Sequence, residues 1–280
     1  VLAGTDHAVT LSQANEFFDM VDGPIIIKAI GGGGGRGTRI VHDKQDLEEA
    51  FERCQSEARA FFGLSDVYVE EFLPCARHIE VQILGDASGS VVHFGDRECS
   101  VQRRNQKVVE IAPAPNLAPS LREKMTSAAV SFAQQEKYMS LGTFEFLVLD
   151  KGIEDDRSVS SATEGHFVFI EANARLQVEH TVTEAVTGLD LGQSQIRVAA
   201  GESLQDVNLQ NGATCRGYAI QARVNMETLR PDGSVLPASG TLTAYEPPSG
   251  PGVRVDGFGY NGYQTSTAFD SLLAKVIVSS

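Results

Sequence analysis

The stretch Ile25–Val41 reads IIIKAIGGGGGRGTRIV and is the most informative part of the chain. Its apolar start predicts a strand that ends near Lys28, and Arg39–Val41 predicts a second strand after the glycines. Five consecutive glycines bring no side chains and cost chain entropy, so packing does not explain them. Their backbone N–H groups suit a phosphate chain, and the stretch indicates a strand–loop–strand flap over phosphates with Lys28 as a cation.

Other glycine motifs fit this stretch less well. Gly32, Gly34 and Gly37 satisfy GxGxxG, but a dinucleotide site needs a helix directly after the loop, and a strand is expected here. A P-loop needs Gly-Lys-Ser/Thr, which Arg36–Thr38 does not supply. The chain also lacks the His-Arg-Asp and Asp-Phe-Gly runs of protein kinases. A mobile surface loop with a solvated lysine is the structural alternative.

Composition narrows the class of protein. The 280 residues include 23 Lys+Arg and 37 Asp+Glu, a formal net charge of −14, with 42% hydrophobic and 21% charged residues. These fractions are typical of a folded soluble protein, and the acidity argues against nucleic-acid and membrane-surface partners. No apolar run approaches a membrane span, and the four cysteines form no CxxC pair. A reducing compartment is expected, the cytoplasm or alternatively the mitochondrial matrix.

The remaining pattern alternates helices and strands. Helices are predicted over 12–21, over 47–61 with Asp43 as the cap and Gly63 as the end, and over 119–136 and 191–200. Strands are predicted over 67–72, 78–84, 91–96, 144–149 and 167–171. The polar segment 150–165 is predicted to be a surface loop. After Cys215 short strands alternate with Gly/Pro turns, so a domain boundary is expected near 202–214.

Two acids occupy strongly apolar strands. Glu145 lies in Gly142–Leu147 (GTFEFL), and Glu171 lies in Phe167–Asn173 (FVFIEAN). A lone carboxylate there would have a large desolvation cost, whereas two on neighbouring strands could share one hard cation, with Asn173 adding an oxygen. The two acids therefore predict a Mg²⁺ site for nucleotide phosphates. The alternative is that each glutamate faces solvent.

Two polar runs stand out from their surroundings. Glu171–His180 (EANARLQVEH) packs acidic, basic and amide side chains closely, and Gln102–Lys107 (QRRNQK) is locally basic. In an acidic chain such a cationic run suggests an anion site, although an exposed cationic loop is the commoner explanation.

These motifs together resemble the ATP-grasp domain of biotin carboxylase. The resemblance rests on Lys28–Gly37, His78–Gln82, Arg97–Lys107 and Phe169–His180, which occur in the family order, and RLQVEH at 175–180 is its most specific part. It implies an α+β fold in which an ATP-grasp domain (1–205, partial at its N-terminal edge) precedes the start of a β-rich biotin carboxylase C-terminal domain (206–280, truncated). Family members use MgATP to convert bicarbonate into carboxyphosphate and deliver CO₂ to N1 of biotin on a carrier domain.

The resemblance also implies roles for individual residues. The nucleotide site would comprise Lys28, Gly32, Gly33, Gly34, Gly35, Glu70, Leu73, His78, Gln102 and Asn105. The metal ligands for Mg²⁺ or Mn²⁺ would be Glu145, Glu171 and Asn173. Bicarbonate would be held by Lys107, Arg175, Gln177 and Val178. Glu179 would be the general base, Arg223 would stabilise the biotin enolate, and Lys107 and Arg175 would complete the catalytic set.

Three positions depart from the commonest family pattern. Asn105 stands where histidine is frequent, Thr38 where methionine is frequent, and Glu71 where lysine is frequent. Other ATP-grasp ligases, such as carbamoyl-phosphate synthase or a purine-pathway carboxylase, would share the metal acids but are not expected to combine RLQVEH with Arg223. An inactive ATP-binding fragment is the further alternative.

The resemblance finally implies what lies outside this chain. Complete members have an α/β domain before this region, so we expect the parent enzyme to be active and these 280 residues alone to be inactive. The expected partners are a biotin carboxyl carrier, a carboxyltransferase and a second copy of the parent. The final acceptor, whether acetyl-CoA, propionyl-CoA, pyruvate or urea, is bound by other domains.

Overall fold

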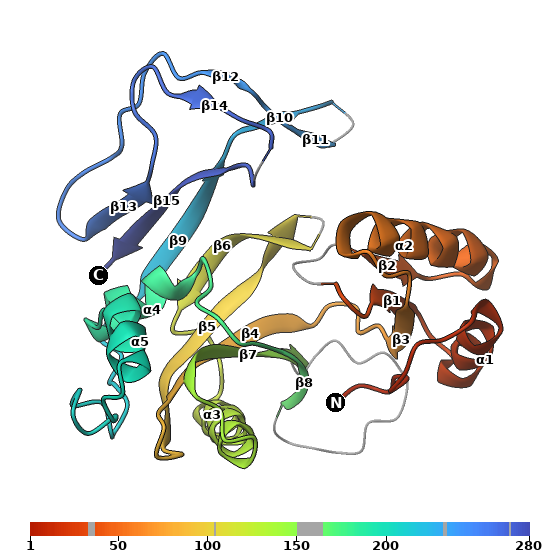
Figure 1. The fold of residues 1–280 in the computed structure, drawn as a ribbon, viewed down its shortest axis with the longest axis horizontal. Helices are drawn as coiled ribbons and strands as arrows, with labels where there is room; N and C mark the ends of the chain where they lie inside the picture. Colours follow the sequence, from red (N-terminus) through yellow and green to blue (C-terminus); the bar gives the residue numbers. More distant parts are fainter. Residues whose placement is uncertain (33–36, 104, 150–164, 232–233, 269) are drawn as a thin grey trace.

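The chain folds into mixed helices and antiparallel strands (Figure 1). The computed structural model describes residues 1–32, 37–103, 105–149, 165–231, 234–268 and 270–280. The predicted Gly33, Gly34 and Gly35 and nearly all of the predicted loop 150–165 lie outside these residues. No helix in the described ranges is both long and apolar enough to cross a membrane.

A small antiparallel sheet near the N-terminus has the strand order β2-β1-β3. Its strands are β1 (Ile25–Ala29), β2 (Thr38–Val41) and β3 (Val67–Glu71). The helices α1 (Leu11–Val21) and α2 (Leu47–Phe62) cover one face of it (Figure 1). Side chains alternate along a strand, so β1 buries Ile25 and Ile27 under these helices and turns Ile26 and Lys28 to the opposite face.

The start of α2 differs from the prediction. A 3-10 turn, η1 (Lys44–Asp46), precedes the helix, and neither Asp43 nor Asp46 caps it with a side-chain hydrogen bond. The predicted cap at Asp43 is therefore wrong. The helix does end at Gly63, whose φ of 77° is a left-handed conformation that glycine adopts at little cost.

The larger sheet of the described residues has eight strands in the order β13-β15-β9-β6-β5-β4-β7-β8. The strands of this sheet are β4 (Arg77–Gly85), β5 (Val91–Arg103), β6 (Gln106–Ala112), β7 (Ser140–Leu149), β8 (His166–Asn173), β9 (Ala219–Asn225), β13 (Val253–Gly257) and β15 (Leu272–Ser279). The predicted pairing of the strands that contain Glu145 and Glu171 is confirmed, because these two residues are opposite each other in the β7–β8 register.

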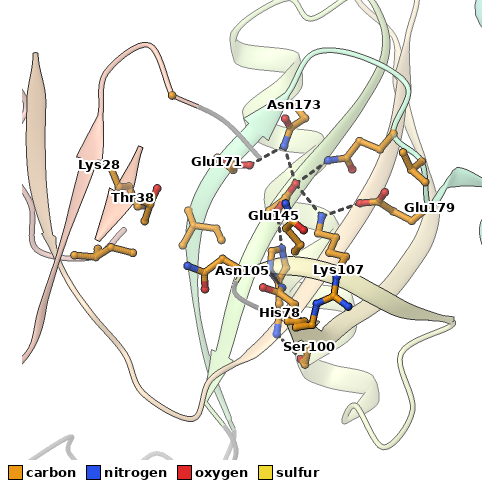
Figure 2. A pocket seen from close by; sticks show the side chains of 18 of the residues that line it. Lys28, Thr38, His78, Ser100, Asn105, Lys107, Glu145, Glu171, Asn173 and Glu179 are labelled. Atoms are coloured by element: carbon orange, nitrogen blue, oxygen red, sulfur yellow. Dashed lines mark hydrogen bonds and ion pairs between the residues drawn. The ribbon is translucent and has the colours of Figure 1, made fainter. Parts of the chain in front are cut away.

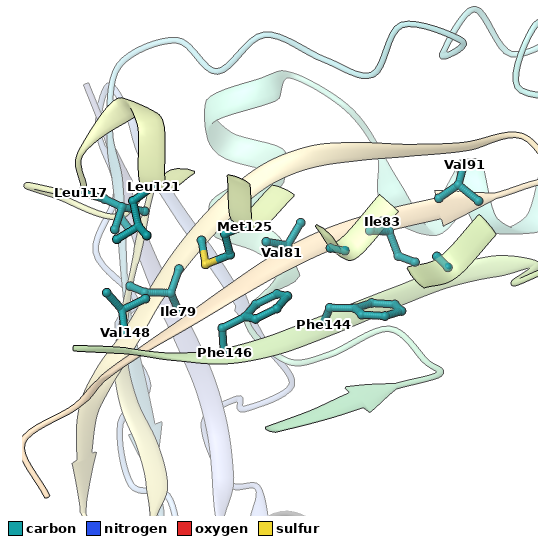
Figure 3. Packing of buried hydrophobic residues seen from close by; sticks show 13 residues of the cluster. Ile79, Val81, Ile83, Val91, Leu117, Leu121, Met125, Phe144, Phe146 and Val148 are labelled. Carbon is teal, nitrogen blue, oxygen red and sulfur yellow. The ribbon is translucent and has the colours of Figure 1, made fainter. Parts of the chain in front are cut away.

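One face of this sheet packs against α3 (Pro119–Gln135). Figure 3 shows Met125 of this helix among Ile79 and Val81 of β4 and Phe146 of β7, all fully or almost fully buried. Alternation sends the intervening residues of β4 and β7 to the other face. That second face contains charged and polar side chains, and it is the face that the site uses.

The C-terminal strands continue the same sheet. The strand β9 pairs with β6 and also with β15. Strands from both sides of the predicted boundary near 202–214 therefore belong to one continuous sheet. Short strands form two further pairs, β10 (Glu227–Leu229) with β11 (Val235–Pro237) and β12 (Gly240–Thr241) with β14 (Gln264–Thr265).

Two helices follow β8. The predicted helix α5 (Leu191–Ala199) is confirmed, whereas α4 (His180–Thr187) was not predicted. Most of α4 is buried, including Thr181, Val182 and Glu184, and it contacts β5, β6, β9 and β15. Its burial fixes the position of the residue directly before it, Glu179.

Candidate functional site

A cleft of about 1180 Å³ lies between the open face of the small sheet and the polar face of the larger one. Every described residue that the sequence assigned to a site contributes to its lining. These residues are Lys28, Gly32, Glu70, Leu73, His78, Gln102, Asn105, Lys107, Glu145, Glu171, Asn173, Arg175, Gln177, Val178, Glu179 and Arg223. The fold thus brings together residues that are nearly 200 positions apart, while their individual roles stay predictions.

A row of charges crosses four neighbouring strands on the floor of the cleft. The registers place Arg97 of β5 opposite Glu80 of β4, Glu80 opposite Glu145 of β7, and Glu145 opposite Glu171 of β8. Like charges directly opposite each other destabilise a sheet, so three adjacent carboxylates need cations close by.

Arg97 neutralises the first carboxylate. Its guanidinium is fully buried and donates to Glu80 Oε2 at 3.0 and 3.2 Å. Its other donors make hydrogen bonds with Gln82, Thr183, Thr143 and Gln177. A buried charge persists only when it is paired and hydrogen-bonded, and this arginine is both.

The predicted metal acids differ in exposure. Glu145 is 3% exposed, whereas Glu171 is exposed to the cleft. Both accept hydrogen bonds from the Asn173 amide, at 2.6 Å for Glu145 and 2.9 Å for Glu171 (Figure 2). Carboxylates that share one donor lie close enough to share a hard cation, and oxygen is the ligand type that Mg²⁺ prefers. The donor set therefore fits the predicted metal.

Glu145 is held in its ionised form. Burial opposes ionisation, but His78, with Nε2 2.6 Å from Glu145 Oε2, together with Lys107 and Gln177, lowers the pKa of Glu145 to about 2. A carboxylate that is ionised throughout the neutral range can bind a cation without first losing a proton.

Lys107 joins three carboxylates. Its ammonium contacts Glu80. It also donates to Glu179 Oε1 at 2.7 Å and lies 3.3 Å from Glu145 Oε1 (Figure 2). The Lys107 side chain is 13% exposed. The description of the basic run 102–107 as an exposed cationic loop therefore does not hold for Lys107. Because it points to the acids, this cation is placed where an incoming anion would meet it.

Glu179 is the one acid of the predicted catalytic set, and it is deeply buried. It is 2% exposed, and Arg223 Nη2 donates to its second carboxylate oxygen at 2.9 Å. Burial opposes ionisation, but the positive charges of Lys107, Arg97 and Arg223 lower the pKa of Glu179 to about 2. Arg223 also donates to Glu110, a buried carboxylate whose pKa is raised chiefly by burial.

The opposite end of the cleft has a different character. Lys28 of the small sheet pairs with Glu70 at 2.5 Å and lies 5.9 Å from the ring centre of Tyr68.

The predicted nucleotide residues of the larger sheet lie closer to the acids. Gln102 donates to His78 Nδ1 and to the carbonyl of Cys99, both at 2.9 Å. Asn105 has a left-handed backbone with φ of 62°, which asparagine tolerates better than most residues.

Arg175 is the most available cation of the predicted set. It is exposed, and within the described part of the chain its guanidinium pairs with no carboxylate. Its hydrogen bonds to Asn173 Oδ1 and the Leu176 carbonyl are long, both at 3.4 Å. Because no carboxylate of the described residues pairs with it, this cation beside the predicted metal acids is suited to receive an anion.

Sequence reasoning did not single out Glu80 or Arg97. Both lie inside quoted motifs, His78–Gln82 and Arg97–Lys107, but only the strand register shows that they are neighbours of the predicted acids. The available signal was the charge within the otherwise apolar run around Glu80, the same signal that identified Glu145.

Two family models match the chain. The model for the carbamoyl-phosphate synthase L chain, ATP binding domain, matches residues 1–207, and the model for the biotin carboxylase C-terminal domain matches residues 221–280. The predicted fold, an ATP-grasp domain followed by the start of the biotin carboxylase C-terminal domain, is confirmed by these matches and the structural relatives.

Curated relatives carry carboxylase names. A biotin carboxylase of a Nostoc species is 49% identical over 255 residues, covering 91% of this chain and 53% of that protein. The human mitochondrial pyruvate carboxylase is 48% identical over 280 residues, covering 99% of this chain and 22% of that protein. The chain thus spans about half the length of the first relative and under a quarter of the second.

Solved structures agree with these names. The biotin carboxylase domain dimer of Hydrogenobacter thermophilus 2-oxoglutarate carboxylase, a complex with MgADP, ADP and bicarbonate, has a TM-score of 0.89 and 38% identity. It is matched over all of this chain and 58% of that one. A β-γ-ATP complex of biotin carboxylase from Campylobacter jejuni has a TM-score of 0.85 and 37% identity, covering 100% of this chain and 59% of that one.

The lowered pKa of Glu179 predicts a pH-dependent effect on stability. Its pKa falls from 4.5 to about 2 on folding, so its ionised form contributes stability that is complete above pH 4.5 and is lost as pH falls toward 2. Glu179→Gln should therefore lower the free energy of unfolding by at most about 3 kcal/mol at pH 7, and the deficit should shrink toward pH 3. Urea unfolding across this range measures it.

The matched control is Glu52→Gln, an exposed position on α2 outside the cleft, which should change stability little at any pH. A Glu179→Gln deficit that stayed constant from pH 6 to pH 3 would contradict the ionised assignment.

Proposed function

Since the chain belongs to the family of the carbamoyl-phosphate synthase L chain ATP-binding domain, we propose that it forms the ATP-dependent biotin carboxylation site of a biotin-dependent carboxylase. The observation that carries the proposal is the placement of Glu179 between Lys107 and Arg223, in one cleft with Glu145 and Glu171. Such a cleft can hold a nucleotide, a metal and a small anion together.

In the proposed reaction, a bicarbonate oxygen attacks the γ-phosphorus of ATP, ADP leaves, and carboxyphosphate forms. Carboxyphosphate then gives CO₂ and phosphate, and the CO₂ bonds to N1 of biotin as that nitrogen loses its proton to the released phosphate. Mg²⁺, held by Glu145, Glu171 and Asn173, would neutralise phosphate charge when bound. Mn²⁺ has the same preference for oxygen ligands and is the alternative ion.

We assign the first proton transfer to Glu179, which would accept the bicarbonate proton. A pKa near 2 makes it ionised but a weak base while Lys107 and Arg223 hold it. Bicarbonate entering beside Lys107, Arg175 and Gln177 would divert positive charge from Glu179 and raise its pKa toward a useful value. Arg223 would then be available to the developing enolate of biotin.

The nucleotide would occupy the end of the cleft near the small sheet. Lys28 and the glycine loop would bind phosphates there, and Glu70, Leu73, His78, Gln102 and Asn105 would contact the rest of the nucleotide. Lys28 is paired with Glu70, so phosphate binding would replace that ion pair with a stronger charge-assisted contact.

The complete protein, rather than these 280 residues, is the proposed enzyme, because the chain spans only 58% of the H. thermophilus chain it matches. We propose a biotin carboxyl carrier and a carboxyltransferase as partners, as the carboxylase names of the relatives suggest, and a homo-oligomer. We propose a location in the cytoplasm or the mitochondrial matrix, and the human relative is named a mitochondrial enzyme.

A carbamoyl-phosphate synthase activity is the second candidate, because the matching model over 1–207 bears that name. It also activates bicarbonate with ATP but does not use biotin. The match of residues 221–280 to a biotin carboxylase domain and the contact of Arg223 with Glu179 favour the first candidate.

The deciding experiment is ATP cleavage by the complete protein with and without bicarbonate, and then with free biotin. The proposal expects cleavage to depend on bicarbonate and to rise when biotin is added. ATP hydrolysis indifferent to bicarbonate would refute it, and stimulation by ammonia rather than biotin would favour the carbamoyl-phosphate alternative.

Glu179→Gln should lower kcat at least 100-fold, because an amide cannot accept the bicarbonate proton. MgATP affinity should stay within twofold, since Glu179 lies at the anion end of the cleft. Steady-state kinetics and equilibrium MgATP binding measure the two quantities. Loss of nucleotide binding with retained kcat would show that Glu179 is not the base.

Glu171→Gln should weaken the dependence of nucleotide binding on Mg²⁺, because it removes one anionic oxygen from the metal set. Titrating Mg²⁺ at fixed ATP should give a midpoint raised about tenfold, and Glu52→Gln is the surface control. A midpoint equal to that of the unmodified protein would argue against the paired-carboxylate site.

A further inference from the structure

The segment that precedes α4 is held from two sides by neighbouring strands. Arg223 of β9 and Lys275 of β15 are directly opposite each other in the strand register. Arg223 donates to the Glu179 carboxylate at 2.9 Å, and the Lys275 ammonium donates to the backbone carbonyl of Val178 at 2.9 Å. One strand pair thus binds both the side chain of Glu179 and the peptide group before it.

Lys275 is an unusual residue for its position. It is 8% exposed, and burial is the main cause that lowers its pKa below the ordinary lysine value. The Asp256 carboxylate lies 3.7 Å away but makes two 2.8 Å hydrogen bonds with Arg254. Desolvating an ammonium is unfavourable, and the close contact with the Val178 carbonyl offsets part of this desolvation free energy.

We propose that Lys275 is a positioning residue for the base, fixing the peptide group between Val178 and Glu179 so that the carboxylate lies between Lys107 and Arg223. The argument is geometric. A peptide group is planar, so holding its carbonyl oxygen also sets the direction of the Glu179 N–H and Cα. This inference rests on the proposed role of Glu179, and Lys275 itself is not among the residues that line the cleft.

A purely structural role makes a different prediction. Lys275, Asp256, Arg254 and Glu184 form a chain of charges that connects β15 and β13 to α4. If stability were the only purpose, an apolar residue of similar length would at most lower the melting temperature and would leave kcat per MgATP-binding site unchanged, because losing one partner of a buried charge pair affects folding rather than turnover. The Asp256 carboxylate would keep Arg254 as its partner.

The test is Lys275→Met in the complete protein. We expect kcat for bicarbonate-dependent ATP cleavage, expressed per MgATP-binding site, to fall about tenfold, with KM for MgATP within twofold. Lys275→Arg, which keeps a cationic donor, should recover most of the kcat. The control Asp256→Asn leaves the Val178 contact in place and should keep kcat within twofold.

A second measurement does not depend on turnover. Hydrogen exchange in Lys275→Met should accelerate in the backbone of Glu179–Val182 while the core strands stay protected, because the segment loses its fixed carbonyl. Activities are expressed per MgATP-binding site, so that unfolded protein does not lower the apparent kcat.

Two results would overturn the inference. One is a Lys275→Met variant in which kcat and the hydrogen exchange of Glu179–Val182 are unchanged, while ATP cleavage by the unmodified protein depends on bicarbonate. The other is a loss of kcat in Lys275→Met that Asp256→Asn reproduces, which would assign the effect to the charge chain. An unmodified protein that ignores bicarbonate would instead refute the proposed function, and with it the role of Lys275.

Discussion

The repulsion among carboxylates on neighbouring strands is the constraint on which the site depends. Glu80, Glu145 and Glu171 face one another in register, and a fourth acid, Glu179, reaches the same group through Lys107. At about 4 Å and an effective dielectric of about 20, each like-charge pair costs roughly 4 kcal/mol. The fold must therefore hold cations here whether or not a ligand is bound.

The cations come from three different parts of the sequence. Arg97 belongs to β5 and is buried beside Glu80, Lys107 belongs to β6, and Arg223 belongs to β9. Acidic side chains of the chain itself pair with these cations, so the site is electrostatically organised by the fold. An anionic substrate would not need to create positive charge but only to compete for it, and the exposed Arg175 is the first cation it would meet.

Local chemistry predicted much of this arrangement. Apolar alternation identified β4, β7 and β8, and an acid inside an apolar strand identified Glu145. The charge partners Glu80 and Arg97 could not be found in the same way, because strand register is a tertiary property. The helix α4 was missed because threonines provide much of its buried face, and its start lies within a polar run that gives no helical period.

The C-terminal strands show that residues on both sides of a change in sequence composition can belong to one site. The composition changes after Cys215, yet β9 pairs with β6 and contributes Arg223 to the cleft. Its neighbour β15 supplies Lys275 to the backbone of Val178. The position of Glu179 therefore depends on residues from both sides of the predicted boundary. Two units that share one sheet in this way are constrained to act as one site, because displacing β9 would leave Glu179 without one of its two close cations.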